Sequence, residues 1–100
     1  MTLSTRIDLL AELGHYLRTG GDADLDNAIQ QANIENQWFT EENIRGALEA
    51  IAVTMLDREK LAAWTAAYHL PDSPYPTKTI GLVMAGNIPA VGFHDWLCVF

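Results

Sequence analysis

The expected fold depends on residues 79–100, TIGLVMAGNIPAVGFHDWLCVF. The near-continuous apolar run over residues 80–84 is typical of a β-strand that is covered on both faces. Gly86 and Asn87 then indicate a tight turn, and Pro89 is a residue type favoured at the first position of a helix. The sequence therefore predicts a strand, a turn and a helix that opens at Pro89.

The expected strand has no second strand to pair with in this sequence. A strand leaves its backbone donors and acceptors unpaired unless a neighbour supplies partners. Residues 96–100 also contain no charge, no capping glycine and no other helix-ending signal. These features predict the amino-terminal piece of a larger α/β enzyme, cut inside its first β-α unit. The missing partners are expected in further sequence or in another copy of the chain.

Residues 1–70 show the patterns of about four helices, with apolar residues at helical spacing after each start signal. The start signals are Thr5 with Asp8, Asp22 or Asp24, Thr40, and Asp57. Residues 71–78 contain three prolines, which exclude a helix and indicate a linker. The expected organisation is thus a helical region over 1–70, a proline-rich linker over 71–78, and a strand-turn-helix over 79–100 that belongs to a truncated cofactor-binding domain.

The charge pattern excludes several classes of protein. The chain has a net charge of -7 and no lysine or arginine cluster, which argues against nucleic-acid binding. Its charged residues concentrate in 1–60, so that residues 61–100 are expected to be interior material. No signal-peptide pattern begins the sequence, and one cysteine builds no disulfide framework, which favours the cytoplasm. Polar residues interrupt the apolar segment 80–100, which argues against a membrane span.

The turn at residues 86–89 is the segment best suited to chemistry. Ligands of open α/β sheets bind outside the carboxyl ends of the strands, where this turn is expected to lie. Asn87 would project a neutral amide donor there, and such a donor stabilises negative charge that develops on an oxygen. The alternative is that Asn87 only caps the following helix.

Other candidate sites are weaker. Gly81 and Gly86 have the spacing of a P-loop, but no lysine follows them, and no G-x-G-x-x-G is present. His94 and Cys98 could share a metal, yet two ligands do not complete a zinc site. Cys98 could be a nucleophile, but its apolar neighbours favour inert packing in a helix. Three residues are expected to be core anchors: Trp38, Trp64 and Trp96.

Two segments carry a family resemblance. Residues 84–98, MAGNIPAVGFHDWLC, closely resemble a signature of the bacterial fatty acyl-CoA reductases (the LuxC-like family). Residues 36–48, NQWFTEENIRGAL, look like a second familiar segment of that family. The resemblance implies a fold similar to the aldehyde dehydrogenase superfamily, of which this chain would hold the N-terminal part. It also implies NADPH- or NADH-dependent reduction of a fatty acyl thioester to an aldehyde through a cysteine acyl-enzyme.

The resemblance assigns roles to four residues. Asn87 would be the oxyanion donor to the thioester oxygen, and Met84, Ala85, Gly86 and Asn87 would border the nicotinamide cofactor. Many aldehyde dehydrogenases have Pro-Trp where this chain has Ala85-Gly86. No metal is implied. The family's nucleophilic cysteine lies downstream of Cys98, so the resemblance implies that these 100 residues alone are inactive.

Two other functions remain open at the level of sequence. The chain could be a free-standing helical interaction module that forms a homo-oligomer through residues 79–100. It could also be a small cofactor- or acyl-binding domain without catalysis. An exposed apolar strand would favour the first of these, because such a strand pairs readily with another chain.

Overall fold

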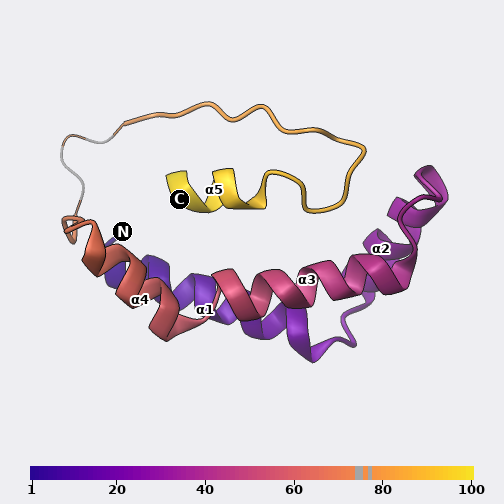
Figure 1. Cartoon of the computed structure of the whole chain (residues 1–100), viewed down its shortest axis with the longest axis horizontal. Helices are drawn as coiled ribbons and strands as arrows, with labels where there is room; N and C mark the ends of the chain where they lie inside the picture. The colour runs from indigo at the N-terminus through magenta and orange to yellow at the C-terminus, as the bar shows by residue number, and fades with distance from the viewer. Residues whose placement is uncertain (74–75, 77) are drawn as a thin grey trace.

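The computed structural model describes residues 1–73, 76 and 78–100, and the regular structure in this part of the chain is entirely helical (Figure 1). Four helices follow one another closely in the first part of the chain, and a fifth lies near its end. Their bounds are α1 Leu3–Thr19, α2 Ala23–Glu35, α3 Glu41–Met55, α4 Arg58–Ala67 and α5 Phe93–Val99.

Side-chain caps define where the first four helices begin. In each, the capping oxygen accepts a hydrogen bond of 2.9–3.2 Å from the backbone N–H three residues later, which satisfies an otherwise orphan donor. The caps are Thr2, Asp22, Thr40 and Asp57. The expected helix starts at the last three are confirmed. The first helix begins earlier than predicted, because Thr2 caps it and Thr5 supplies the N–H.

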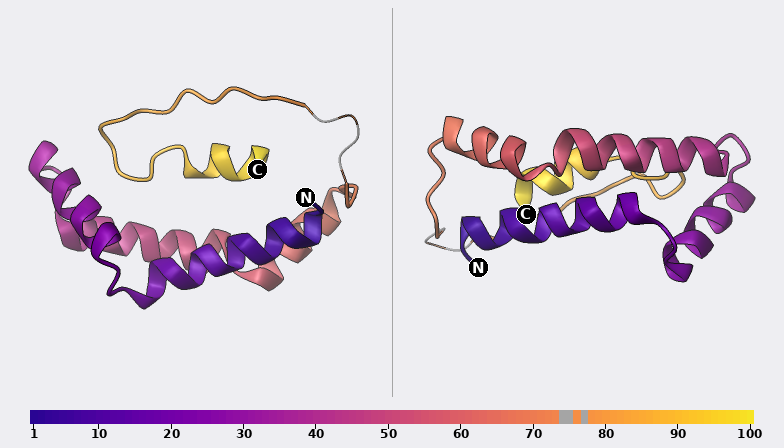
Figure 2. Two further views of the ribbon diagram at one scale, coloured as in Figure 1. Left: turned by 180° about the vertical axis from the view of Figure 1, so that it is seen from behind. Right: turned by 90° about the horizontal axis from the view of Figure 1, so that it is seen from below.

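Helices α1 to α4 form one curved layer, and α5 lies on the concave side of that layer (Figures 1 and 2). Helix α1 packs along α3 and also contacts α4. The core lies where α5 meets the layer, and its buried side chains come from α1, α4, α5 and the α3–α4 junction. They are Leu10, Leu56, Leu61 and Leu97. Burial of these leucines is the main force that holds α5 in place.

The predicted strand is absent, and the predicted α/β class is therefore wrong for the described residues. Residues 78–86 run as an extended segment over α5 without any backbone hydrogen bond to the rest of the described chain (Figure 1). Ile80 is 59% exposed and Val83 fully exposed, so the segment is not covered on both faces. An apolar run becomes a strand only when a second strand pairs with it. The expected linker lies partly outside the described residues, because 74, 75 and 77 are not described.

The last helix also begins later than predicted, at Phe93 instead of Pro89. Ala90 and Gly92 have φ angles of 58° and 77°, in the left-handed region that a right-handed helix cannot include. Two successive turns result, closed by hydrogen bonds from Val91 N–H to the Ile88 carbonyl (3.3 Å) and from Phe93 N–H to the Ala90 carbonyl (3.2 Å).

Residues 61–100 are more exposed than the sequence predicted. Among the tryptophans, Trp96 packs against the core as expected, but Trp64 is only partly covered and Trp38 is 90% exposed. The core-anchor prediction for Trp38 is therefore wrong, because it lies in the short turn between α2 and α3. No helix in the described ranges combines the length and apolar character needed to cross a bilayer.

Candidate functional site

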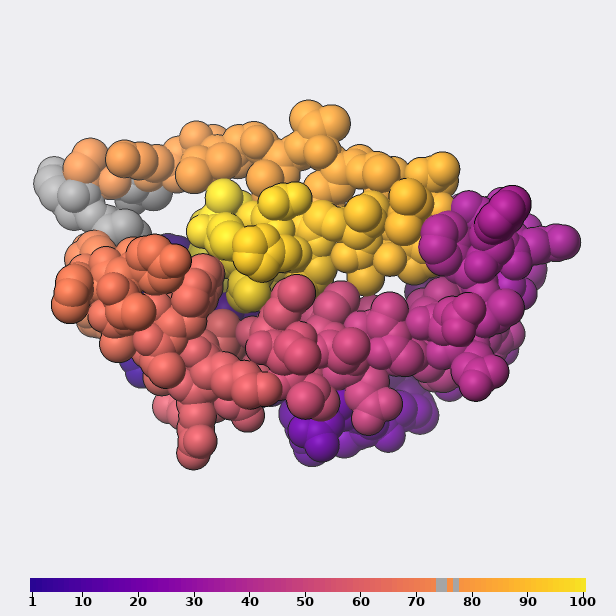
Figure 3. Space-filling model, in the orientation of Figure 1, coloured from indigo at the N-terminus to yellow at the C-terminus, as the bar shows by residue number. Residues whose placement is uncertain are grey.

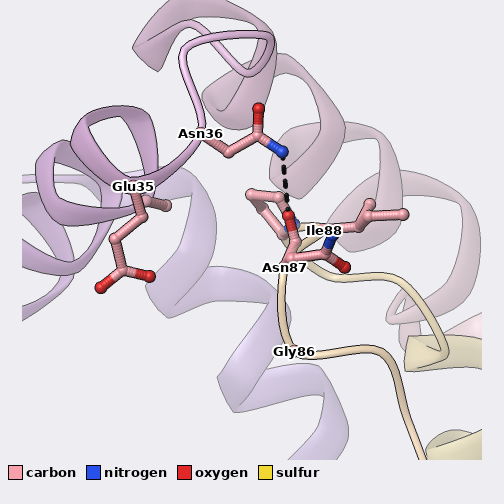
Figure 4. Close-up of a pocket in the computed structure, with 7 residues that line it drawn as sticks. Glu35, Asn36, Gly86, Asn87 and Ile88 are labelled. Carbon is pink, nitrogen blue, oxygen red and sulfur yellow. Dashed lines mark hydrogen bonds between the residues drawn. The ribbon is translucent and has the colours of Figure 1, made fainter.

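The turn at residues 86–89 lies against the end of α2, and the two enclose a pocket of about 320 Å³ (Figure 4). The turn contributes Gly86, Asn87, Ile88 and Pro89, and α2 with its C-cap contributes Ala32, Glu35 and Asn36. Two segments that are far apart in the sequence thus form one concave surface.

Asn36 fixes the turn to α2. It is the C-cap residue of α2, and its backbone N–H donates to the Ala32 carbonyl at 3.0 Å. Its side-chain Oδ1 accepts from the Trp38 backbone N–H at 3.2 Å. The side-chain Nδ2 donates to the backbone carbonyl of Asn87 at 3.3 Å (Figure 4). Both ends of the Asn36 amide are therefore engaged, which orients the amide and positions the turn.

The side chain of Asn87 has no hydrogen-bond partner among the described residues, and Asn87 itself is exposed. The N-cap of α5 is Gly92, and no side chain caps that helix. The alternative that Asn87 serves only as the cap is therefore wrong, because the helix begins after two further turns. The geometry leaves the Asn87 amide available to a ligand in the pocket.

Glu35 gives the pocket a negative charge. Its carboxylate accepts a hydrogen bond from Gln31 Nε2 at 3.1 Å. A carboxylate repels phosphate groups but accepts hydrogen bonds from an amide. The sequence did not single out Glu35 or Asn36 as site residues. For Asn36 a signal was present, because it opens the segment 36–48 that carries part of the family resemblance.

Only two of the four residues expected to border a cofactor reach this pocket, namely Gly86 and Asn87. Met84 instead lies over Gly92, where an added Cβ would come within 3.0 Å of the Met84 sulfur. Ala85 is exposed and does not line the pocket. An added Cβ at Gly86 would meet nothing within 4 Å, so a flat group can approach the backbone there.

His94 and Cys98 are neighbours on α5. The Cys98 sulfur lies 3.9 Å from Nδ1 and 3.8 Å from Nε2 of His94. Within the described ranges no cluster of three or more His, Cys, Asp or Glu side chains is arranged to hold a metal. Cys98 is exposed, which corrects the expectation that it packs inside an apolar helix. The buried face of α5 is carried by Leu97 instead.

Comparisons of this chain with protein-family models, with curated proteins and with solved structures give no match. A function for this chain is therefore a proposal, based on the chemistry of the pocket and on the two segments singled out in the sequence, residues 36–48 and 84–98. These two segments supply residues on opposite sides of the same pocket, Asn36 on one side and residues 86–89 on the other.

Proposed function

We propose that this chain is the N-terminal part of an NAD(P)H-dependent acyl-CoA reductase, which converts a fatty acyl thioester to an aldehyde through a cysteine acyl-enzyme. The observation that carries the proposal is the hydrogen bond between Asn36 Nδ2 and the Asn87 carbonyl, 3.3 Å long. It joins the two segments that separately resemble this family, although they are far apart in the sequence. A chance resemblance gives no reason for the two segments to meet.

Asn87 has a definite role in this proposal. Its side-chain amide donates to the oxygen of the acyl thioester, and this bond strengthens as negative charge develops on that oxygen. The neutral amide forms no permanent ion pair, so it can release the product. Asn36 acts as a positioning residue because it holds the Asn87 backbone from the far side of the pocket.

The described residues fit one end of the cofactor. The open space at Gly86 admits the flat nicotinamide ring, and the Glu35 carboxylate can accept from its carboxamide. The phosphates of the cofactor must bind elsewhere, because the Glu35 carboxylate repels them and the volume of about 320 Å³ is too small to hold them as well as the ring. When bound, the reduced nicotinamide supplies the hydride that replaces the sulfur at the acyl carbon.

The proposal requires a cysteine nucleophile and the rest of the cofactor site from sequence beyond these residues. The proposal includes a location in the cytoplasm, which the lack of a disulfide framework in these 100 residues favours. The decisive test is aldehyde formation from a fatty acyl-CoA by the complete gene product. We expect Asn87→Ala to lower kcat by about 10²-fold with little change in cofactor affinity.

Asn43→Ala is the matched control, since Asn43 is an exposed asparagine on α3 that does not line the pocket. We expect it to leave the rate unchanged. An Asn87→Ala enzyme with the wild-type rate would contradict the oxyanion role. A complete gene product that forms no aldehyde with any acyl-CoA would contradict the family assignment itself.

A second candidate function is homo-oligomerisation through residues 79–100, and the exposed extended segment favours it. Ile80, Val83 and Met84 are exposed, and the backbone around them makes no hydrogen bonds among the described residues. A second copy could pair with this backbone as an added strand and cover the apolar side chains.

Light scattering over a range of concentrations tests this second candidate. A dimer that Val83→Lys converts to a monomer would support it, because a lysine on an exposed edge strand opposes pairing with another chain. Val53→Lys on α3 is the control, since Val53 is also exposed but lies outside the segment. A monomer at every concentration would exclude it.

A further inference from the structure

A second pocket, of about 260 Å³, lies where α5 rests on the junction of α3 and α4. Figure 3 shows α5 (yellow) seated against these helices (pink and salmon). The apolar walls of this pocket come from Met55, Leu61, Trp64 and Leu97. Leu61 and Leu97 belong to the buried core, so the floor of the pocket is fixed by packing. This pocket is separate from the one at Asn87, with which it shares no residue.

The lining of this pocket contains a basic side chain and no acidic one, although the chain as a whole is acidic. The chain has a net charge of -7, and four other pockets on the described surface each include an acidic side chain, Glu35, Asp57 or Asp72. This pocket includes none. Lys60 therefore gives its lining a formal positive charge, which attracts an anion.

Two polar groups at the pocket can bind an anion. Lys60 lines it, and its ammonium donates to the Val53 carbonyl at 2.8 Å, which anchors the group and uses one of its three N–H donors. His94 lines it from α5 and offers a ring N–H. A carboxylate is one small anion that suits both groups, since its two oxygens can accept from separate donors.

The walls favour an aromatic body for such a ligand. Trp64 is 38% exposed, and Tyr68 holds its ring in a T-shaped contact with centroids 6.0 Å apart. Aromatic rings pair well with a fixed indole, and the thioether of Met55 also prefers to contact a ring. The volume of about 260 Å³ suits a ligand of one or two rings.

We propose that the pocket between α3, α4 and α5 binds small aromatic carboxylates, with Lys60 and His94 at the carboxylate and Trp64 and Met55 at the ring. Because the ligand contacts α5 and the helical layer together, it stabilises the seating of α5. A ligand that binds the folded chain and not the unfolded chain raises the stability, and the gain grows with the logarithm of ligand concentration above the dissociation constant.

The test is titration of the full chain with 1-naphthoate, followed by the NMR signals of the Trp64 indole N–H and the His94 ring. Trp64→Phe assigns the indole signal. We expect the NMR signals of both residues to shift together as 1-naphthoate is added and to reach a plateau, and the melting temperature to rise. We expect 1-naphthamide, which lacks the charge, and octanoate, which lacks the ring, to bind more weakly.

Two lysine variants test whether Lys60 supplies the positive charge that binds the carboxylate. Lys60→Met keeps the apolar stem and should weaken 1-naphthoate about fivefold, the size of an exposed ion pair, without affecting 1-naphthamide. Lys78→Met is the matched control, since Lys78 is exposed and lies outside the pocket. The proposal is overturned if the Trp64 signal does not move, if octanoate binds as tightly as 1-naphthoate, or if Lys60→Met has no more effect than Lys78→Met.

Discussion

Gly14 of α1 lies directly against Leu56, so closely that an added Cβ would come within 2.8 Å of the Leu56 Cβ and 3.1 Å of its carbonyl oxygen. Leu56 is the most deeply buried side chain of the core, with 2% exposure. Gly14 therefore sets the distance at which α1 packs against the junction of α3 and α4. That junction also carries α5 through Leu97.

Gly14→Ala should destabilise the chain, although alanine is the better helix former. We expect a loss of about 1–3 kcal/mol in the free energy of unfolding, because the methyl group meets a Cβ and a backbone oxygen that cannot rotate away. Urea denaturation measures the change. Gly46→Ala is the control: nothing lies within 4 Å of that position in α3, and a gain of about 0.5–1 kcal/mol is expected. Equal effects of the two substitutions would contradict the close contact at Gly14.

The cap of α2 makes stability depend on pH. The N–H of Leu25, and secondarily the Tyr16 hydroxyl, lower the pKa of Asp22 from its ordinary 3.8 by stabilising the carboxylate. A lowered pKa in the folded state means that the contribution is complete above pH 3.8 and is lost as the pH falls through the folded value. We expect Asp22→Ala to lower the urea midpoint at neutral pH and to differ less from the wild type in acid.

NMR titration of the Asp22 carboxyl checks this assignment, with Tyr16→Phe as the matched variant. Removal of the hydroxyl should raise the pKa of Asp22 part of the way back toward 3.8, since the Leu25 N–H remains and is the larger cause of the lowered pKa. The carboxylate of Asp22 in turn raises the pKa of Tyr16 above 10.0. An Asp22 pKa that is unchanged in Tyr16→Phe would show that the two side chains do not interact.

Local signals in the sequence predicted the helical layer well. Thr40 and Asp57 were identified as helix starts, and Asp22 was one of two candidates, because a cap is a contact between residues three apart. The extended segment was predicted wrongly because Ile80 and its neighbours have the composition of a buried strand. The composition of a segment indicates that it can form a strand when a second strand pairs with it. The described chain provides no second strand.

The pocket at Asn87 could be predicted only in part. The turn was found from Gly86 and Asn87, since both residue types favour turns. The position of Asn36 opposite the turn depends on a contact across 51 positions of sequence, and no local pattern encodes such a contact. The second pocket was missed for the same reason, because it forms only when α5 seats Leu97 against α3 and α4.

The beginning of α5 offers the sharpest test of the fold. Ala90 has a φ of 58°, and this conformation costs an alanine about 1–2 kcal/mol, which glycine avoids. Ala90→Gly should therefore stabilise the chain by about 0.5–1 kcal/mol after the greater entropy of glycine in the unfolded state is counted. A helix that opened at Pro89 would give the opposite sign, because glycine inside a helix destabilises it by about 1 kcal/mol. Ala85→Gly is the control: Ala85 has no positive φ, so only the entropic loss is expected there. Urea denaturation of the two variants thus distinguishes the two turns of the structure from the helix that the sequence predicted.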